Sequence, residues 1–405
     1  MRQTWRWFGP SDAVLIEDLL QAGVQGVVTA LHDVAPGTVW SADKIAQRQH
    51  EIAHKADGSA SALDWEVVES LPVSEDIKRQ TGSWKQHIEN YRQSLTSLSA
   101  AGIDVVCYNF MPILDWTRTD LACRLPSGAT CMRFDVVDFA VFDIHILKRA
   151  DAAADFSEEI GEIAQQRFAT MSGSNKAKLL DNIVCGLPGA AQTMSLDDVR
   201  EYLSVYNNIS AEQLRANFVD FLAEVAPHAQ KLGMRLCCHP DDPPHPLLGL
   251  PRIMSTEAHY QQVLEAVDLQ SNGVTLCSGS LGARSDNDLP GMMERLGDRV
   301  HFLHLRNVER ESDQLFGSFH ESEHLAGGTD MVALIAAVIK EENKRQQVGR
   351  SDISIPFRPD HGQNILDDHT RDTQPGYPAI GRLKGLAELR GVAAALGHPA
   401  HGAFA

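Results

Sequence analysis

Four strands expected in the second half of the chain carry, at or next to their ends, side chains of the types that bind divalent metal ions. These side chains are, in chain order, His239, Cys277, His304 and Asp360. In a barrel of parallel strands, consecutive strand ends converge on one mouth, so the four are predicted to form a single site. Two imidazoles, a thiolate and a carboxylate suit several divalent metals, and these residue types alone do not rank manganese, iron, cobalt and zinc.

Further polar residues are expected at the same mouth. Arg306 and Arg358 flank the proposed ligands, and an arginine beside a metal can hold a substrate carboxylate through two parallel hydrogen bonds. Asn109 ends another expected strand and His32 follows a second one, so both are candidates for binding substrate. The aspartates at 241–242 either orient the imidazoles or belong to a loop stiffened by the prolines that follow them.

The elements that must position these residues alternate between short apolar strands and longer amphipathic helices. Eight such units predict an α/β fold, a single (β/α)8 barrel domain spanning residues 1–405. An open, doubly wound sheet is the alternative, but no Gly-rich phosphate-binding turn follows any strand. The expected strands are 4–8, 24–31, 65–69, 103–109, 234–239, 273–277, 300–306 and 353–357.

The alternation of strands and helices stops between residues 110 and 210. This segment contains polar helical stretches and no clear strand–helix unit, so a helical insertion after the fourth strand is predicted. Its length exceeds that of ordinary βα loops, which predicts a lid over the active site or an assembly surface. The tail at 397–405 is expected to be loose, with His398 and His401 solvated rather than metal-bound.

Composition narrows the classes of partner. The chain has 405 residues and a formal net charge of -18, which argues against nucleic acid or an anionic membrane as its main partner. A small anionic substrate stays possible, because a metal and a few arginines can reverse the field inside a cleft. Neither a signal peptide nor a membrane span is expected, and the seven cysteines are interpreted as reduced thiols of a cytoplasmic protein.

Several long motifs resemble those of the mannonate dehydratase family, which acts in hexuronate catabolism. The resemblance begins at WRWFG at residues 5–9 and covers nearly the whole chain, although the segment at 310–350 matches less well. The other motifs are YNFMPILDWTRTD at 108–120, HPDDPP at 239–244, LGLPR at 248–252, RPDHG at 358–362, PGY at 375–377 and IGRLKGLAELR at 380–390.

The resemblance implies a TIM barrel related to xylose isomerases, a Mn²⁺ or Fe²⁺ ion, and dehydration of D-mannonate to 2-dehydro-3-deoxy-D-gluconate. A homo-oligomer, a dimer or higher, is also expected. The family's metal ligands fall on the same four strand-end residues. Its acid–base residues fall on His361 and Tyr377. The reaction removes a proton from C2 and a hydroxyl from C3, which requires a base, an acid and a cation that stabilises the developing enediolate. Which of the two residues takes the C2 proton stays open.

Two other functions compete with this interpretation. A metal-dependent aldose–ketose isomerase could use the same barrel, but such sites are richer in Glu and Asp and need no thiolate. A sugar-acid binding protein without catalysis would not need the pair His361 and Tyr377. A metal nuclease is disfavoured by the acidic charge and by the lack of a basic stripe.

Overall fold

The computed structural model describes residues 1–185 and 195–397. The predictions for His398 and His401 therefore lie outside the described residues, as do residues 186–194 of the predicted insertion. No helix in the described part of the chain is both long and apolar enough to cross a membrane.

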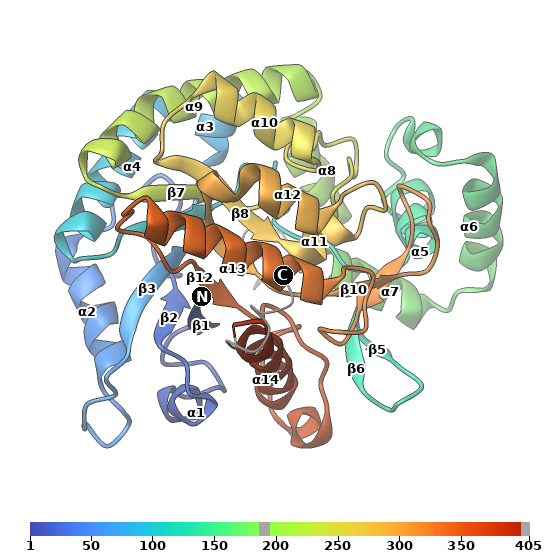
Figure 1. Ribbon diagram of the computed structural model, residues 1–405. Helices are drawn as coiled ribbons and strands as arrows, with labels where there is room; N and C mark the ends of the chain where they lie inside the picture. Colours follow the sequence, from blue (N-terminus) through green and yellow to red (C-terminus); the bar gives the residue numbers. More distant parts are fainter. Residues whose placement is uncertain (186–194, 398–405) are drawn as a thin grey trace.

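Eight parallel strands close into a barrel, which confirms the predicted fold (Figure 1). Strands such as Gly26–Thr29 and Val105–Tyr108 are buried along their whole length, as expected for strands covered on both faces. The first and last strands close the barrel, with Arg2 opposite Pro356. In barrel order the strands are β1 (Arg2–Arg6), β12 (Pro356–Arg358), β9 (Val300–His304), β8 (Asn272–Cys277), β7 (Arg235–Cys238), β4 (Val105–Tyr108), β3 (Asp64–Glu69) and β2 (Gly26–Thr29).

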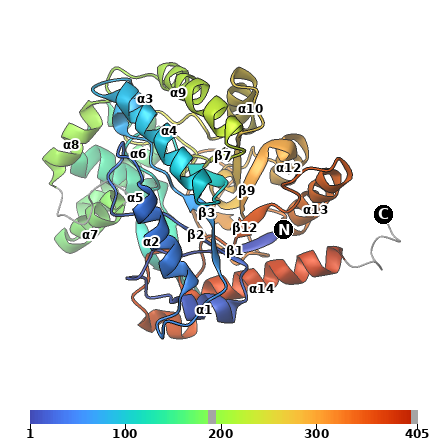
Figure 2. The same cartoon turned by 90° about the vertical axis from the view of Figure 1, so that its left-hand side faces the viewer.

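Helices surround the outside of the barrel (Figures 1 and 2). Several begin at side-chain caps, such as Ser210, whose side chain accepts a hydrogen bond from the backbone N–H of Gln213. The helices outside the 110–204 segment are α1 (Ile16–Ala22), α2 (Ala42–Ala53), α3 (Glu75–Arg79), α4 (Trp84–Ala100), α9 (Ala211–Lys231), α10 (Glu257–Ala266), α11 (Ser278–Gly282), α12 (Leu289–Leu296), α13 (Met331–Gln347) and α14 (Ala379–Leu396), with short turns η3 (Gly297–Arg299) and η4 (Leu366–Thr370).

The segment between β4 and β7 is more than the predicted run of helices. It begins with a hairpin of β5 (Asp120–Arg124) and β6 (Thr130–Phe134), which joins β11 (Phe319–Glu321) and β10 (Val308–Arg310) in a four-stranded antiparallel sheet. Figure 1 shows the helices α5 and α6 to one side of the barrel. The helices of the segment are α5 (Val136–Ala140), η1 (Val141–Leu147), η2 (Ala152–Asp155), α6 (Glu158–Thr170), α7 (Gly173–Val184) and α8 (Leu196–Ser204).

The buried apolar residues form an outer layer and a small inner cluster. The outer layer lies between strands and helices and includes Cys238. The inner cluster fills the barrel and includes Cys237 and Phe302. Strand alternation places Cys237 inside and Cys238 outside, so both are packing residues beneath the strand ends where His239 lies.

Candidate metal centre and active site

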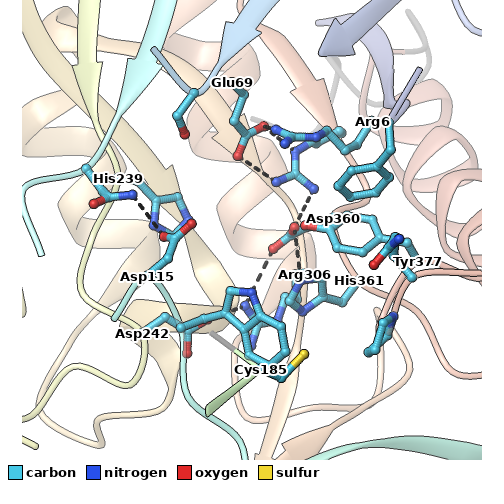
Figure 3. Close-up of a pocket in the computed structure, with 17 residues that line it drawn as sticks. Arg6, Glu69, Asp115, Cys185, His239, Asp242, Arg306, Asp360, His361 and Tyr377 are labelled. Carbon is cyan, nitrogen blue, oxygen red and sulfur yellow. Dashed lines mark hydrogen bonds and ion pairs between the residues drawn. The ribbon is translucent and has the colours of Figure 1, made fainter. Parts of the chain in front are cut away.

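A cavity of about 240 Å³ opens at the carboxyl ends of the barrel strands (Figure 3). Seven of the predicted site residues line it: Asn109, His239, Arg306, Arg358, Asp360, His361 and Tyr377. Cys277 and His304 are fully buried at the ends of β8 and β9 and are not among the lining residues. Trp116 and Cys185 also line the cavity, so the segment between β4 and β7 contributes to its wall.

Three of the four predicted metal ligands form a tight group. The donor atoms of His239, Cys277 and His304 all lie within 4.8 Å of one another. The Nε2 atom of His239 is 3.1 Å from Nδ1 of His304. Ligand bonds to divalent transition metals measure about 2.0–2.3 Å. Two donors of one ion can therefore be separated by up to about twice that length, which is close to the 4.8 Å found here.

In each imidazole, the nitrogen that points away from the group contacts a neighbouring polar atom, and the other nitrogen points into the group. His239 Nδ1 is 2.7 Å from the carbonyl of Pro240, so Nδ1 donates its proton and Nε2 keeps its lone pair. His304 Nε2 lies 3.3 Å from a carboxylate oxygen of Glu69 and 3.2 Å from Arg358 Nε, so both groups hold this nitrogen, while Nδ1 faces His239. Carboxylates and carbonyls bonded to the far nitrogen are typical of metal-binding histidines.

Asp360 lies beside this group. Its Oδ2 atom is 3.7 Å from Cys277 Sγ and 3.8 Å from His304 Nδ1. Burial alone would raise the pKa of Asp360, but the charge of Arg358, the largest opposing influence, helps to hold that pKa well below its usual range. The carboxyl group is therefore ionised, and the donor set of two imidazoles, a thiol and a carboxylate fits a divalent transition metal.

Glu69, at the end of β3, is a site residue that the sequence analysis missed. Both its oxygens accept hydrogen bonds from Arg358, at 2.9 and 2.8 Å, and one lies 3.5 Å from Arg6. Burial opposes ionisation, but Arg358, His304 and Arg6 keep the pKa of Glu69 well below its usual range. Glu69 ends an expected strand, so the rule that identified the ligands could have found it.

His361 and Tyr377 are neighbours in the wall of the cavity. Their rings are 4.9 Å apart in an edge-to-face arrangement. Burial raises the pKa of Tyr377 to about 12, although the charge of Arg358 opposes the shift. On its other side, His361 Nδ1 is 3.2 Å from Glu321 in β11. No sequence signal pointed to Glu321, because it belongs to the four-stranded sheet rather than to a barrel strand.

The remaining predicted residues take different positions. Asn109 Nδ2 donates to Asp115 at 2.9 Å, and both residues line the cavity. His32 is not among the lining residues; it is exposed, with its ring 5.7 Å from that of Phe8 and its Nε2 atom 3.4 Å from Nη2 of Arg6.

The aspartates at 241–242 play different parts. Within the described residues, neither carboxylate hydrogen-bonds an imidazole. Asp241 accepts from the backbone N–H of Met254 at 2.7 Å and holds its own loop. Asp242 lines the cavity and pairs with Arg118 at 2.8 Å and Arg306 at 2.9 Å.

Comparison with known proteins places the whole chain in one family. Residues 1–401 match the family model described as D-mannonate dehydratase (UxuA). The chain is 58% identical over 398 residues to mannonate dehydratase 1 of Agrobacterium fabrum, covering 98% of each chain. It is 54% identical over 402 residues to mannonate dehydratase of Rhizobium meliloti, covering 99% of this chain and 98% of that one. The crystal structure of mannonate dehydratase from Streptococcus suis serotype 2 superposes with a TM-score of 0.75 at 30% identity, covering 98% of this chain and 95% of the other.

Proposed function

The chain belongs to the D-mannonate dehydratase family, and we propose that it is a hydro-lyase that dehydrates D-mannonate to 2-dehydro-3-deoxy-D-gluconate. The observation that carries the proposal is the combination of full-length family membership with a metal-type donor group beside a cavity that holds His361 and Tyr377. The four-residue donor set would hold one divalent ion, Mn²⁺ or Fe²⁺. When bound, the ion supplies a Lewis acid that stabilises negative charge at the carboxylate end of the substrate.

Tyr377 and His361 are proposed to move the two protons. With its pKa raised to about 12, Tyr377 keeps its proton at neutral pH and suits the role of acid toward the departing C3 hydroxyl. His361 then takes the C2 proton, because its Nδ1 already bonds Glu321 and its Nε2 is left to receive a proton. The ring of Phe8 lies 4.8 Å from Tyr377 and limits how far the phenol can move.

The substrate carboxylate needs a cation that is not already neutralised. Arg306 and Arg358, the two predicted arginines, are both committed to buried carboxylates. Arg6 also lines the cavity, and its nearest carboxylate, Glu69, is 3.5 Å away. We therefore assign first contact with the substrate carboxylate to Arg6, with Asn109 beside the chain of hydroxyl groups.

Turnover by defined metal forms of the enzyme tests the function. Metal-free protein is reloaded with Mn²⁺, Fe²⁺, Co²⁺ or Zn²⁺ singly and supplied with a panel of hexonates that differ at C2 and C3. We expect 2-keto acid to form from D-mannonate only after metal is restored. Isomerisation without loss of water, or binding of mannonate without turnover in every metal form, would overturn the proposal.

A further inference from the structure

We propose that Glu321 is a positioning residue that fixes the tautomer and orientation of His361. The inference rests on the proposed function, since it concerns how the proposed base is prepared for its reaction. Glu321 lies on β11, in the sheet built beside the barrel, and reaches the site from outside the ring of eight strands.

The contact between the two side chains is buried. Glu321 Oε1 lies 3.2 Å from His361 Nδ1, and the side chains are only 1% and 7% exposed. Among the described residues, the Glu321 carboxylate is the hydrogen-bond partner of His361 Nδ1. Figure 3 shows His361 beside Tyr377 and Asp360 at the edge of the cavity. The contact fixes one edge of the imidazole, and Nε2, on the other edge, lies 3.8 Å from Oδ1 of Asp360, beyond hydrogen-bond distance.

Two arginines keep Glu321 in the acceptor state. Arg306 Nε donates to Oε2 at 2.7 Å, and Arg118 Nη2 lies 3.4 Å from Oε1. Burial alone would raise the pKa of Glu321, but the charge of Arg306, the contact with His361 and, last, the charge of Arg118 hold it at about 2. A carboxylate without a proton can only accept, so His361 must donate from Nδ1 and carry its lone pair on Nε2.

The geometry therefore resembles the arrangement of a catalytic imidazole backed by a buried carboxylate. In that arrangement the carboxylate selects the tautomer and stabilises the imidazolium that forms when the base takes its proton. The carboxylate itself stays ionised throughout. Here the proton from C2 would arrive on Nε2, while Nδ1 keeps its proton and its bond to Glu321.

Glu321→Gln is the informative variant, because its NH₂ group must take the place of either Oε1 or Oε2, and each of these oxygens now accepts hydrogen bonds. At the Oε2 position that group would face Arg306, a donor, at 2.7 Å. At the Oε1 position it faces His361 at 3.2 Å and the more distant Arg118. The second orientation has the weaker donor–donor conflict, and it offers His361 Nδ1 a donor. The imidazole should then move its proton to Nε2.

Nitrogen NMR on metal-free, substrate-free protein labelled with ¹⁵N-histidine measures this directly, with the His361→Asn variant used to assign the signal. In the wild type we expect Nδ1 to be protonated. In Glu321→Gln we expect Nδ1 to be unprotonated and Nε2 to carry the proton. An unprotonated Nδ1 in the wild type overturns the proposal even if the variant fails to fold. So does an Nδ1 that stays protonated in Glu321→Gln.

Kinetics provide a second readout. Because the wrong tautomer removes the base, Glu321→Gln should lower kcat by at least about 10²-fold while KM changes only a fewfold. The matched control is Glu323→Gln, two residues along the chain, whose carboxylate pairs with Lys384 at the surface and should leave kcat unchanged. Equal kcat losses in both variants would overturn the proposal. A wild type that forms no 2-keto acid from mannonate would refute the proposed function instead, and the NMR result would still decide the tautomer.

Discussion

Glu69 should control how tightly the proposed centre holds its metal, although it is not itself a ligand. Its Oε1 atom is 3.3 Å from His304 Nε2, the nitrogen opposite the proposed ligand atom. The same carboxylate accepts two hydrogen bonds from Arg358. In Glu69→Gln, one side of the new amide is a donor, and it must face either the imidazole or the guanidinium. Both outcomes weaken the support of His304.

The size of the effect can be worked out from these contacts. Replacing an outer partner of a metal-binding histidine costs about 10–100-fold in affinity, or roughly 1.4–2.8 kcal/mol. Arg358 also loses a charged partner, and removing one member of a buried ion pair costs up to about 3–5 kcal/mol. Arg358 keeps Asp360 as a second partner, so the loss of stability should fall below that range. We expect a lower Tm together with a higher Kd for metal.

Titration of Mn²⁺ into metal-free protein, with free Mn²⁺ followed by its EPR signal, measures the affinity. Glu66→Gln is the matched control, because Glu66 lies on the same strand and pairs with Arg2 away from the site. We expect a 10–100-fold rise in Kd for Glu69→Gln and no change for the control. A folded Glu69→Gln protein with the wild-type Kd would refute the assignment of His304 Nδ1 as a ligand supported through Nε2.

Three further predictions concern the other proposed parts of the site. Cys277→Ser should reduce metal retention, measured by elemental analysis after gel filtration, far more than Cys237→Ser; equal losses would remove Cys277 from the ligand set. His361→Asn and Tyr377→Phe should each keep their metal and lose about 10²–10⁴-fold in kcat; metal loss in the first, or near-normal kcat in the second, would reassign that residue. The segment at 110–210 should be protected from limited proteolysis by substrate and metal, or should mediate assembly seen in solution mass; a monomer cleaved equally in both states would contradict both roles.

The barrel and the three grouped donors were predictable because their signals are local. A parallel strand buried on both faces is a short apolar run, and a polar residue at its end points into the common mouth. His239, Cys277 and His304 each follow this rule. His32 shows where the rule fails. The strand before it was expected to reach residue 31, but β2 ends at Thr29, and His32 lies in the turn that follows. Its imidazole is therefore exposed beside Phe8 rather than in the cavity wall.

Glu321 and the β5–β6 hairpin could not be predicted in the same way. The hairpin carries charged residues such as Asp120 and Arg133, so it lacks the apolar run of a barrel strand. Its partner strand is far away in the sequence, since His320 pairs with Arg133. Pairings of this length depend on the completed tertiary structure, and no short motif encodes them.

The chain is strongly acidic, yet its site is built around buried arginines. These arginines explain why the 110–210 segment matters to the chemistry. Arg306 pairs with Glu321 and Asp242 and lies 3.5 Å from Asp360, so it links the small sheet to a proposed metal ligand. Arg118, which enters from the 110–210 segment, bonds both oxygens of Asp242 at 2.8 and 3.0 Å. Without that segment, Asp242 and Glu321 would each lose Arg118 as a cation, and β11, which carries Glu321, would lose its neighbouring strand β6. The segment therefore belongs to the electrostatic support of the site, whatever it also covers or assembles.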